Sequence, residues 1–300
     1  MIRLLDGLHL GRPQVICAGL VGSDALALVD CGPETCFTQL VAEIRRRGLR
    51  PESVTHVLVT HIHLDHSGGA WRWAREFGAM VCVHPRGAAH LADPGKLVAS
   101  ATQIFGADMA RLWGGVQEIP SAQIRIVHDG EEVRAGGAVL RAVETPGHAP
   151  HHQAWWLADE RTLFAGDVCG VSIAGGPVLP PCPPPDINVE LWQASLGKIR
   201  ALDPQRLVLA HFGAVDDPRP RLDELERRLT DWAGWMAEQI RAGRTEEQIV
   251  PLFEQRVAGE LRAAGVDAAG LAAYEQADPA AMSVAGLARY WRKHHPGELG

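Results

Sequence analysis

The stretch VLVTHIHLDHSGGA, residues 57–70, places three histidines and one aspartate within six positions, directly after an apolar run. In an extended segment the side chains at positions i and i+2 point the same way, so His61 and His63 can reach one metal ion. Asp65 and His66 are adjacent and would diverge in an extended chain, but a turn at DHSGG can direct both toward a second ion. The glycines after Ser67 allow that turn. A core strand or an ordinary polar loop does not require this spacing, which therefore predicts a metal centre.

Three further candidate ligands stand where strands are expected to end. His148 lies in ETPGHAP after the run VLRAVE, Asp167 directly follows LFAG, and His211 directly follows LVLA. Each shows the same order: an apolar run, then a candidate ligand with a glycine next to it or two residues away. Because a sheet presents the side chains at its strand ends to a cleft, these three residues can complete sites that the first stretch cannot complete alone.

The order of apolar runs and helical segments predicts an α/β fold. Helices are expected up to Gly48, over 68–78 and over 188–202, whereas 86–118 is helical and irregular and the Gly- and Pro-rich stretch 175–185 is a loop. The expected strands are two around the turn GSD within 14–30, then 55–60, 79–85, 123–127, 138–144, 153–158, 162–166 and 206–213.

The composition changes after about residue 216, where amphipathic helices take over. Two of them, over 220–243 and 245–265, each close on a glycine. A third is expected from 283 to 295, with Ser283 as its candidate N-cap. We therefore predict a catalytic domain over 1–215 and a helical region over 216–300 that covers the substrate or forms a homodimer contact. Its apolar faces are expected to bury against the main domain or against a second subunit.

The whole chain excludes several classes of protein. A net charge of −7 over 300 residues disfavours nucleic acid as the main partner, since phosphate binding needs a surplus of Lys and Arg on one face. No apolar run approaches the ~20 residues that cross a bilayer, and the first residues lack the pattern of a secretory signal. We expect a cytoplasmic protein, without a nucleic-acid or membrane partner, whose six cysteines are reduced and form no CxxC pair.

Taken in order, THIHLDH, TPGH, AGD and AHFG resemble the metallo-β-lactamase-fold hydrolases over roughly residues 14–213. The resemblance implies a four-layer αββα sandwich, with a C-terminal helical appendage here, and metal ions between the loop ends of two sheets. Within the superfamily the motifs are similar to glyoxalase II and the lactonases, and the tail is similar to that of bacterial members with helical C-terminal segments. Carried over to this sequence, the family pattern implies that metal one is bound by His61, His63 and His148, metal two by Asp65, His66 and His211, and that Asp167 bridges them.

The resemblance also implies a reaction. Two divalent metal ions about 3.5–4 Å apart can share a hydroxide whose pKa is near 7, and that hydroxide would attack a small ester, thioester, lactone or amide. Asp65 is the candidate catalytic residue, because it can orient the nucleophile and accept its proton. Imidazole and carboxylate ligands suit zinc, with iron or manganese as alternatives. The predicted partner is a small-molecule substrate.

Three other functions stay open within this resemblance. The persulfide dioxygenases bind one iron through part of the same ligand set, the RNA-processing relatives are nucleases, and a non-catalytic binding module would keep the ligands without turnover. Lactonases of this fold place a tyrosine in the active site, but this chain has only Tyr274 and Tyr290, both in the helical region. A standard lactonase arrangement therefore requires that region to fold over the cleft.

The remaining candidates have simpler interpretations. His56 and His84 are expected to be supporting or structural residues, and His151 and His152 either support the ligands or line the rim. Cys169 is expected to be a small buried residue, and residues 289–295, RYWRKHH, a solvated helix end with favourable dipole placement. We place substrate specificity in 86–118, 175–185 and the helical tail. Residues expected to be surface or structural are His9, His90, His128, His294 and His295, and those expected to pack in the core or rim are Trp71, Trp73, Trp155, Trp156 and Trp192.

Overall fold

Two six-stranded sheets lie at the centre of a computed structural model of the protein, which describes residues 1–299. The first sheet has the order β1-β2-β3-β4-β5-β6 and the second the order β12-β11-β10-β9-β8-β7. The strands of the first sheet are β1 (Ile2–Asp6), β2 (Cys17–Gly22), β3 (Leu26–Val29), β4 (Val54–Leu58), β5 (Met80–Val83) and β6 (Ile124–Ile126). Those of the second are β7 (Glu132–Ala135), β8 (Ala138–Glu144), β9 (Gln153–Leu157), β10 (Thr162–Gly166), β11 (Arg206–Leu209) and β12 (Gly213–Asp216).

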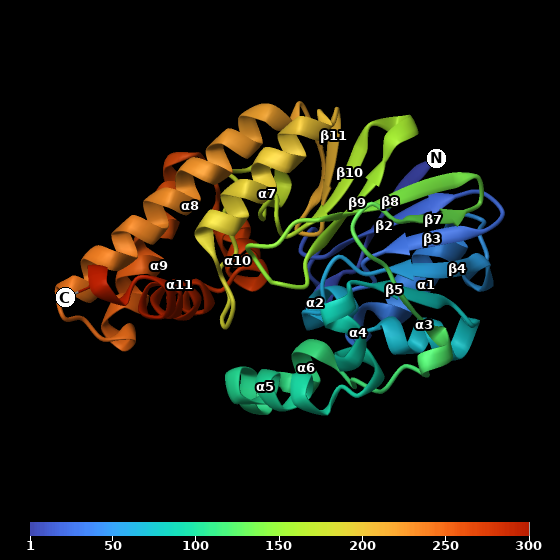
Figure 1. Ribbon diagram of the computed structural model, residues 1–300, viewed down its shortest axis with the longest axis horizontal. Helices are drawn as coiled ribbons and strands as arrows, with labels where there is room; N and C mark the ends of the chain where they lie inside the picture. Colours follow the sequence, from blue (N-terminus) through green and yellow to red (C-terminus); the bar gives the residue numbers. More distant parts are fainter. Residues whose placement is uncertain (300) are drawn as a thin grey trace.

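The strand directions explain why helices cover the outer faces. β3, β4, β5 and β6 run parallel, so each connection must cross back over the sheet, and α1 (Phe37–Arg46), α3 (Ala70–Phe77) and α4 (Pro85–Ala92) lie in these connections. In the second sheet only β10 and β11 are parallel, and α7 (Val189–Leu202) connects them. Helices therefore flank two packed sheets (Figure 1), and the predicted αββα sandwich is confirmed.

Apolar side chains of both sheets meet in the middle of the sandwich. Val21, Leu58 and Cys82 from the first sheet cluster with Trp155 and Phe164 from the second. A larger cluster joins the outer faces of the sheets to the helices, and α1 contributes to it through Phe37, Leu40, Val41 and Ile44, at the spacing of one buried helical face. Central strands such as β3, β9 and β10 are thus buried on both faces, which fixes where their carboxyl ends lie.

Residues 86–118 form three helices joined by irregular segments, as the sequence predicts. They are α4, α5 (Gly95–Phe105) and α6 (Met109–Trp113). Figure 1 shows α5 and α6 projecting from the side of the first sheet, below α10 and α11 in this view. The short α2 (Leu64–Ser67) provides the predicted turn that carries Asp65 and His66.

The helical region consists of α8 (Pro218–Arg241), α9 (Glu246–Ala263), α10 (Ala268–Ala277) and α11 (Ala280–His294). α8 packs against α7, and α11 packs against α8 and α9, with the rings of Trp232 and Phe253 4.7 Å apart between α8 and α9. The division at residue 215 stays a prediction. Within residues 1–299, no helix combines the length and the apolar character that crossing a membrane requires.

The prediction that Ser283 caps the last helix is wrong. α11 begins at Ala280, directly after Pro279, so Ser283 lies one turn inside the helix and is fully buried. Its hydroxyl donates to Asp278 and accepts a hydrogen bond from the backbone N–H of Cys182. A tertiary contact with the 175–185 loop therefore uses the hydroxyl that a cap would have used.

Candidate metal centre

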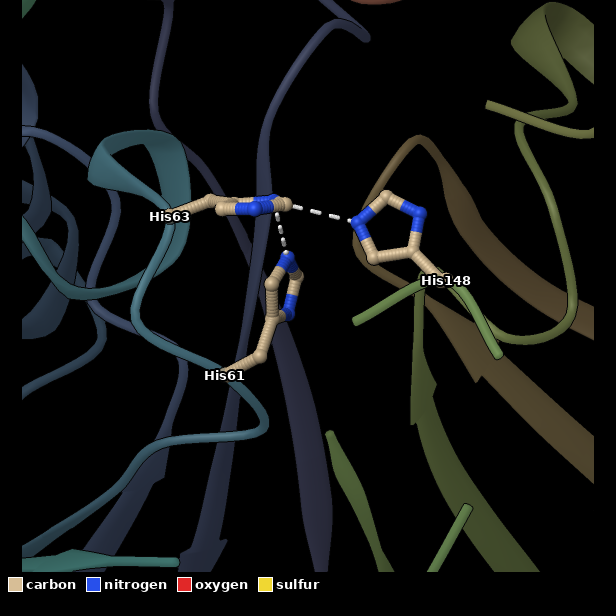
Figure 2. A group of neighbouring side chains, drawn as sticks. All are labelled: His61, His63 and His148. Atoms are coloured by element: carbon tan, nitrogen blue, oxygen red, sulfur yellow. Dashed lines mark hydrogen bonds between the residues drawn. The ribbon is translucent and has the colours of Figure 1, made fainter. Parts of the chain in front are cut away.

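His61, His63 and His148 converge on one point from the two sheets. His61 and His63 lie in the loop between β4 and α2, whereas His148 lies in the turn after β8. The Nδ1 atom of His63 lies 2.9 Å from Nε2 of His61 and 3.1 Å from Nε2 of His148 (Figure 2). Three imidazole nitrogens that face one another at this spacing can hold one metal ion.

Asp65, His66 and His211 form a second group beside the first. The Oδ2 atom of Asp65 lies 3.6 Å from Nε2 of His66 and 3.4 Å from Nε2 of His211. Asp65 and His66 come from α2, and His211 follows β11 of the other sheet. These three donor atoms can also surround one ion.

Asp167 faces both groups. Its Oδ2 atom is 3.4 Å from Nε2 of His148, while its Oδ1 atom is 3.3 Å from Nε2 of His66 and 3.6 Å from Nε2 of His211. It directly follows Gly166, which has a φ of 52°. A Cβ atom at Gly166 would lie 2.6 Å from the Thr60 hydroxyl, so the glycine of AGD allows the two sheets to approach each other beneath the site.

The chemistry of these seven residues fits metal ions. Nε2 of His66, Nε2 of His211 and Oδ1 of Asp167 are buried, and no protein group within residues 1–299 forms a hydrogen bond with any of them. Buried polar atoms are nearly always paired, and neutral imidazole and carboxylate are the donors that zinc, iron and manganese accept. The structure therefore brings together every ligand that the sequence predicts, although ligation itself stays a prediction.

The pKa shifts follow from burial and from the charges inside the site. Burial lowers the pKa of His63 to about 3. Burial also lowers the pKa of His61 well below 6.5, and the neighbouring His66 lowers it further. Burial alone would raise the pKa of Asp167, but the neighbouring His66 and His211 hold it well below 3.8. The first group therefore presents neutral imidazoles, the form that binds metal, and the second gathers carboxylate charge that favours a cation.

Backbone carbonyls orient two of the histidines. Nδ1 of His148 donates to the carbonyl of Pro181 at 2.9 Å, and Nδ1 of His211 donates to the carbonyl of Val15 at 2.7 Å. A proton on Nδ1 leaves Nε2 free as a lone pair that points at the site.

Asp30 is a supporting residue that the sequence analysis missed. Its carboxylate accepts hydrogen bonds from the backbone N–H of Thr60 at 2.8 Å, from the Thr60 hydroxyl at 2.8 Å and from Nδ1 of His66 at 2.9 Å. It thereby fixes the ring of His66 and the segment that leads to His61. Asp30 follows the apolar run ALALV, the same signal that identified Asp167, and that signal could have revealed it.

His152 supports the site, and His151 lines its rim. Nε2 of His152 accepts a hydrogen bond from the backbone N–H of Asp167 at 3.2 Å, and its Nδ1 lies 2.8 Å from the Thr145 hydroxyl. The half-buried ring of His151 lies 5.7 Å from that of His63 and lines the cavity in front of the site. The sequence left both roles open for both residues, and the structure separates them.

The other residues that the sequence analysis interpreted as structural have the following contacts and burial. His84 is bonded to Glu144 and accepts from the first turn of α4, and Cys169 is buried among apolar groups. Lys293 and His295, near the end of α11, pair with Asp186 and Glu190, as expected of a solvated helix end. Among the tryptophans, Trp73, Trp155, Trp156 and Trp192 are buried and Trp71 is half-buried.

A cavity of about 650 Å³ opens in front of the candidate metal centre. Asp65 and Asp167 lie in its wall, and His9 and His90, predicted to be surface or structural, also line it. His9 is buried, and its ring stacks on Trp113 at 5.6 Å. Because the helix that carries Trp113 is far from His9 in the sequence, local patterns could not predict this placement.

The helical region reaches the cavity through residues 276–279 and Met282. The Gln276 side chain donates to the carbonyl of His9 and accepts from the Arg12 guanidinium, which fixes this segment against the N-terminal part of the chain. Tyr274 donates to the carbonyl of Pro177, and Tyr290 bonds to Glu190. The helical region thus forms part of the cavity wall, but neither tyrosine lines the cavity, and the standard lactonase arrangement is not formed.

Known proteins are similar to this chain in sequence and in fold. The chain is 30% identical over 183 residues to the metallo-beta-lactamase fold-containing protein ST1585 of Sulfurisphaera tokodaii, a match that covers 60% of this chain and 68% of that protein. It is 30% identical over 161 residues to a hydroxyacylglutathione hydrolase of Rhodospirillum rubrum, covering 52% of this chain and only 47% of that relative.

A solved structure shows the same fold over nearly the whole chain. The metallo-beta-lactamase family protein TTHA1429 from Thermus thermophilus superposes with a TM-score of 0.65 at 21% identity, covering 97% of this chain and 93% of that one. The family model for the metallo-beta-lactamase superfamily matches residues 12–211, well over half of the chain. With its sandwich and its converging histidines and aspartates, the chain belongs to the metallo-beta-lactamase superfamily.

Proposed function

We propose that the protein is a hydrolase that uses two divalent metal ions, with zinc as the first candidate and iron or manganese as alternatives, to cleave a small ester, thioester, lactone or amide. The observation that carries the proposal is the position of Asp167 between two groups of donor atoms at the floor of a cavity. The hydroxyacylglutathione hydrolase relatives support hydrolysis as the reaction class.

The seven ligands would be shared between two ions according to the two groups that they form in the structure. His61, His63 and His148 would hold one ion, Asp65, His66 and His211 the other, and Asp167 would contact both. Bound there, two divalent ions would supply Lewis acidity for a carbonyl oxygen and lower the pKa of a water molecule toward neutrality.

Asp65 is placed to handle a proton. Its side chain is 22% exposed and lines the cavity, whereas that of Asp167 is only 5% exposed. The same carboxylate that faces His66 and His211 can therefore orient an attacking water, accept its proton and deliver that proton to the leaving group.

The site favours hydrolysis over the alternatives. A persulfide dioxygenase needs one iron and part of this ligand set, whereas both groups converge here. The net charge of −7 argues against an RNA substrate. A cytoplasmic location and a homodimer through the apolar faces of the helical region remain predictions.

Metal analysis combined with a hydrolysis panel on the same purified sample tests the proposal. His63→Ala and Asp167→Ala should lower the metal content and abolish most hydrolysis of esters and thioesters, while His128→Ala, at an exposed position, should change neither. Full activity in a variant that has lost its metal would refute the proposal. Two bound ions without turnover on any substrate would favour a binding module instead.

A further inference from the structure

The walls of the cavity are mainly apolar and come from separate parts of the chain. Leu97, Ile104 and Phe105 of α5 form one side together with α6, and Met282 forms another together with the prolines at 181 and 183–185. Ile104 is 43% exposed although it lines the cavity. When such exposed apolar surface inside a concave site encloses an apolar ligand group, both leave water, and this makes binding more favourable.

Positive charge lies at the α4–α5 side of the same cavity. Arg86 and Lys96 line it and are exposed, and neither forms an ion pair within residues 1–299. The acidic residues of the lining that lie outside the metal centre already have partners: Asp186 pairs with Lys293 at 3.2 Å, and Asp278 accepts a hydrogen bond from Ser283. Two cations are therefore available to a ligand anion.

We propose that the substrate joins an apolar acyl group several carbons long to an anionic group, that the acyl group packs against α5, α6 and Met282, and that the anion contacts Arg86 and Lys96. This inference rests on the proposed hydrolase function and specifies its substrate class. Hydrolysis adds water across the acyl C–O or C–S bond, giving a carboxylic acid and an alcohol or thiol, and needs no further reactant.

A small polar substrate would contact neither the apolar walls nor both cations of the cavity. It would keep the α5 and α6 side chains in contact with water, whereas each methylene group that leaves water raises affinity by about fourfold. A neutral apolar substrate would use the walls but not the cations, and one exposed charge pair changes affinity by about two- to fivefold. The cavity, at about 650 Å³, is in the range of sites that enclose drug-sized ligands.

Binding of thioethers, which cannot be hydrolysed, separates this inference from the reaction. S-ethyl, S-butyl and S-octyl derivatives of N-acetylcysteamine, glutathione and coenzyme A vary the chain length and change the thiol from neutral to carboxylate-bearing or phosphate-bearing. Calorimetry on the metal-loaded protein should show affinity that rises with chain length and is higher for at least one anionic thiol, which identifies the anion. Affinity independent of chain length, or equal for neutral and anionic thiols, would overturn the inference.

Variants assign the two halves of the ligand. Arg86→Glu and Lys96→Glu should each weaken the anionic S-octyl ligand at least about twofold and leave the neutral one unchanged, whereas Ile104→Asn should weaken S-octyl ligands more than S-ethyl ligands. Arg50→Glu makes the same charge change at an exposed residue outside the cavity, before β4, and should have no effect. If the thioethers bind as expected but the matching thioesters are not hydrolysed, the proposed function fails and the binding inference stands. If the thioesters are hydrolysed but neither longer chains nor anionic thiols are preferred, the proposed function stands and the binding inference fails.

Discussion

Replacing Asp30 with asparagine should weaken the second proposed metal site while the protein stays folded. Asp30 is 4% exposed and has a φ of 50°, in the left-handed region that asparagine also tolerates. The asparagine side chain could still accept the backbone N–H of Thr60, which Asp30 accepts through Oδ1. The substitution therefore adds no backbone strain, whereas a substitution with alanine would add strain.

The damage should arise at the other side-chain atom. Oδ2 of Asp30 accepts from both Nδ1 of His66 and the Thr60 hydroxyl, and an amide NH₂ in its place is a donor. Nδ1 of His66 would then have to accept, which moves its proton to Nε2, the atom that faces Asp167. Loss of such a supporting partner costs about 10- to 100-fold in metal affinity, and the lost charged hydrogen bonds cost about 1–3 kcal/mol of unfolding free energy.

Competition with a chromophoric chelator measures the affinity of each ion, and urea unfolding of the metal-free protein measures stability. Asp30→Asn should lose affinity mainly for one of two ions. Asp24→Asn, at an exposed position in the β2–β3 turn, makes the same chemical change and should match the wild type. Wild-type affinity for both ions in Asp30→Asn would refute the role of Asp30, and an equal loss at both sites would refute its assignment to the second.

Two more predictions concern pH and helix packing. Burial opposes a proton on His66, but Asp167 and the other carboxylates nearby raise the pKa of His66 well above 6.5. A group whose pKa is higher in the folded than in the unfolded protein stabilises the fold at a pH below its unfolded-state pKa. That stabilisation is lost as the pH rises through the folded-state pKa. Up to about pH 7 this loss is opposed by His61 and His63, because their lowered pKa values make the folded state gain stability as the pH rises. Thermal melts in chelator should therefore show the metal-free protein losing stability above about pH 7.5, where those two histidines are neutral in both the folded and the unfolded state, and a melting temperature that rises there would contradict this. In α11, Gly286→Ala would place a Cβ 1.9 Å from the carbonyl of Cys182 and should destabilise by roughly 2 kcal/mol or more. In α8, Gly234→Ala has open space and should stabilise by about 0.5–1 kcal/mol, so urea unfolding that ranks the two variants alike would be inconsistent with this packing.

The sequence revealed the seven candidate ligands because each carries a local signal. His148, Asp167 and His211 each follow an apolar run with a glycine one or two residues away, and the fold brings these strand ends together. By contrast, β1, β7 and β12 were not predicted, and all three are edge strands. An edge strand pairs on one side only and can be short and charged, so its apolar pattern is weak.

Contacts between distant segments account for the other differences. Ser283 carries the residue type of a cap, but Pro279 starts the helix earlier, and the hydroxyl then bonds to the chain at Cys182. The approach of Gln276 to His9 likewise joins the two ends of the chain. No local pattern encodes such pairs, so the sequence could not identify which residues of the helical tail reach the cavity.

The division of ligands between the sheets links metal binding to folding. His61, His63, Asp65 and His66 follow a strand of the first sheet, whereas His148, Asp167 and His211 follow strands of the second. Each ligand group therefore takes residues from both sheets, and neither can form until the sheets have packed. Ions that bind only the packed state stabilise it by mass action, so bound metal would hold the sandwich closed at the edge where the cavity opens. The apolar core between the sheets in turn sets the spacing of the donor atoms.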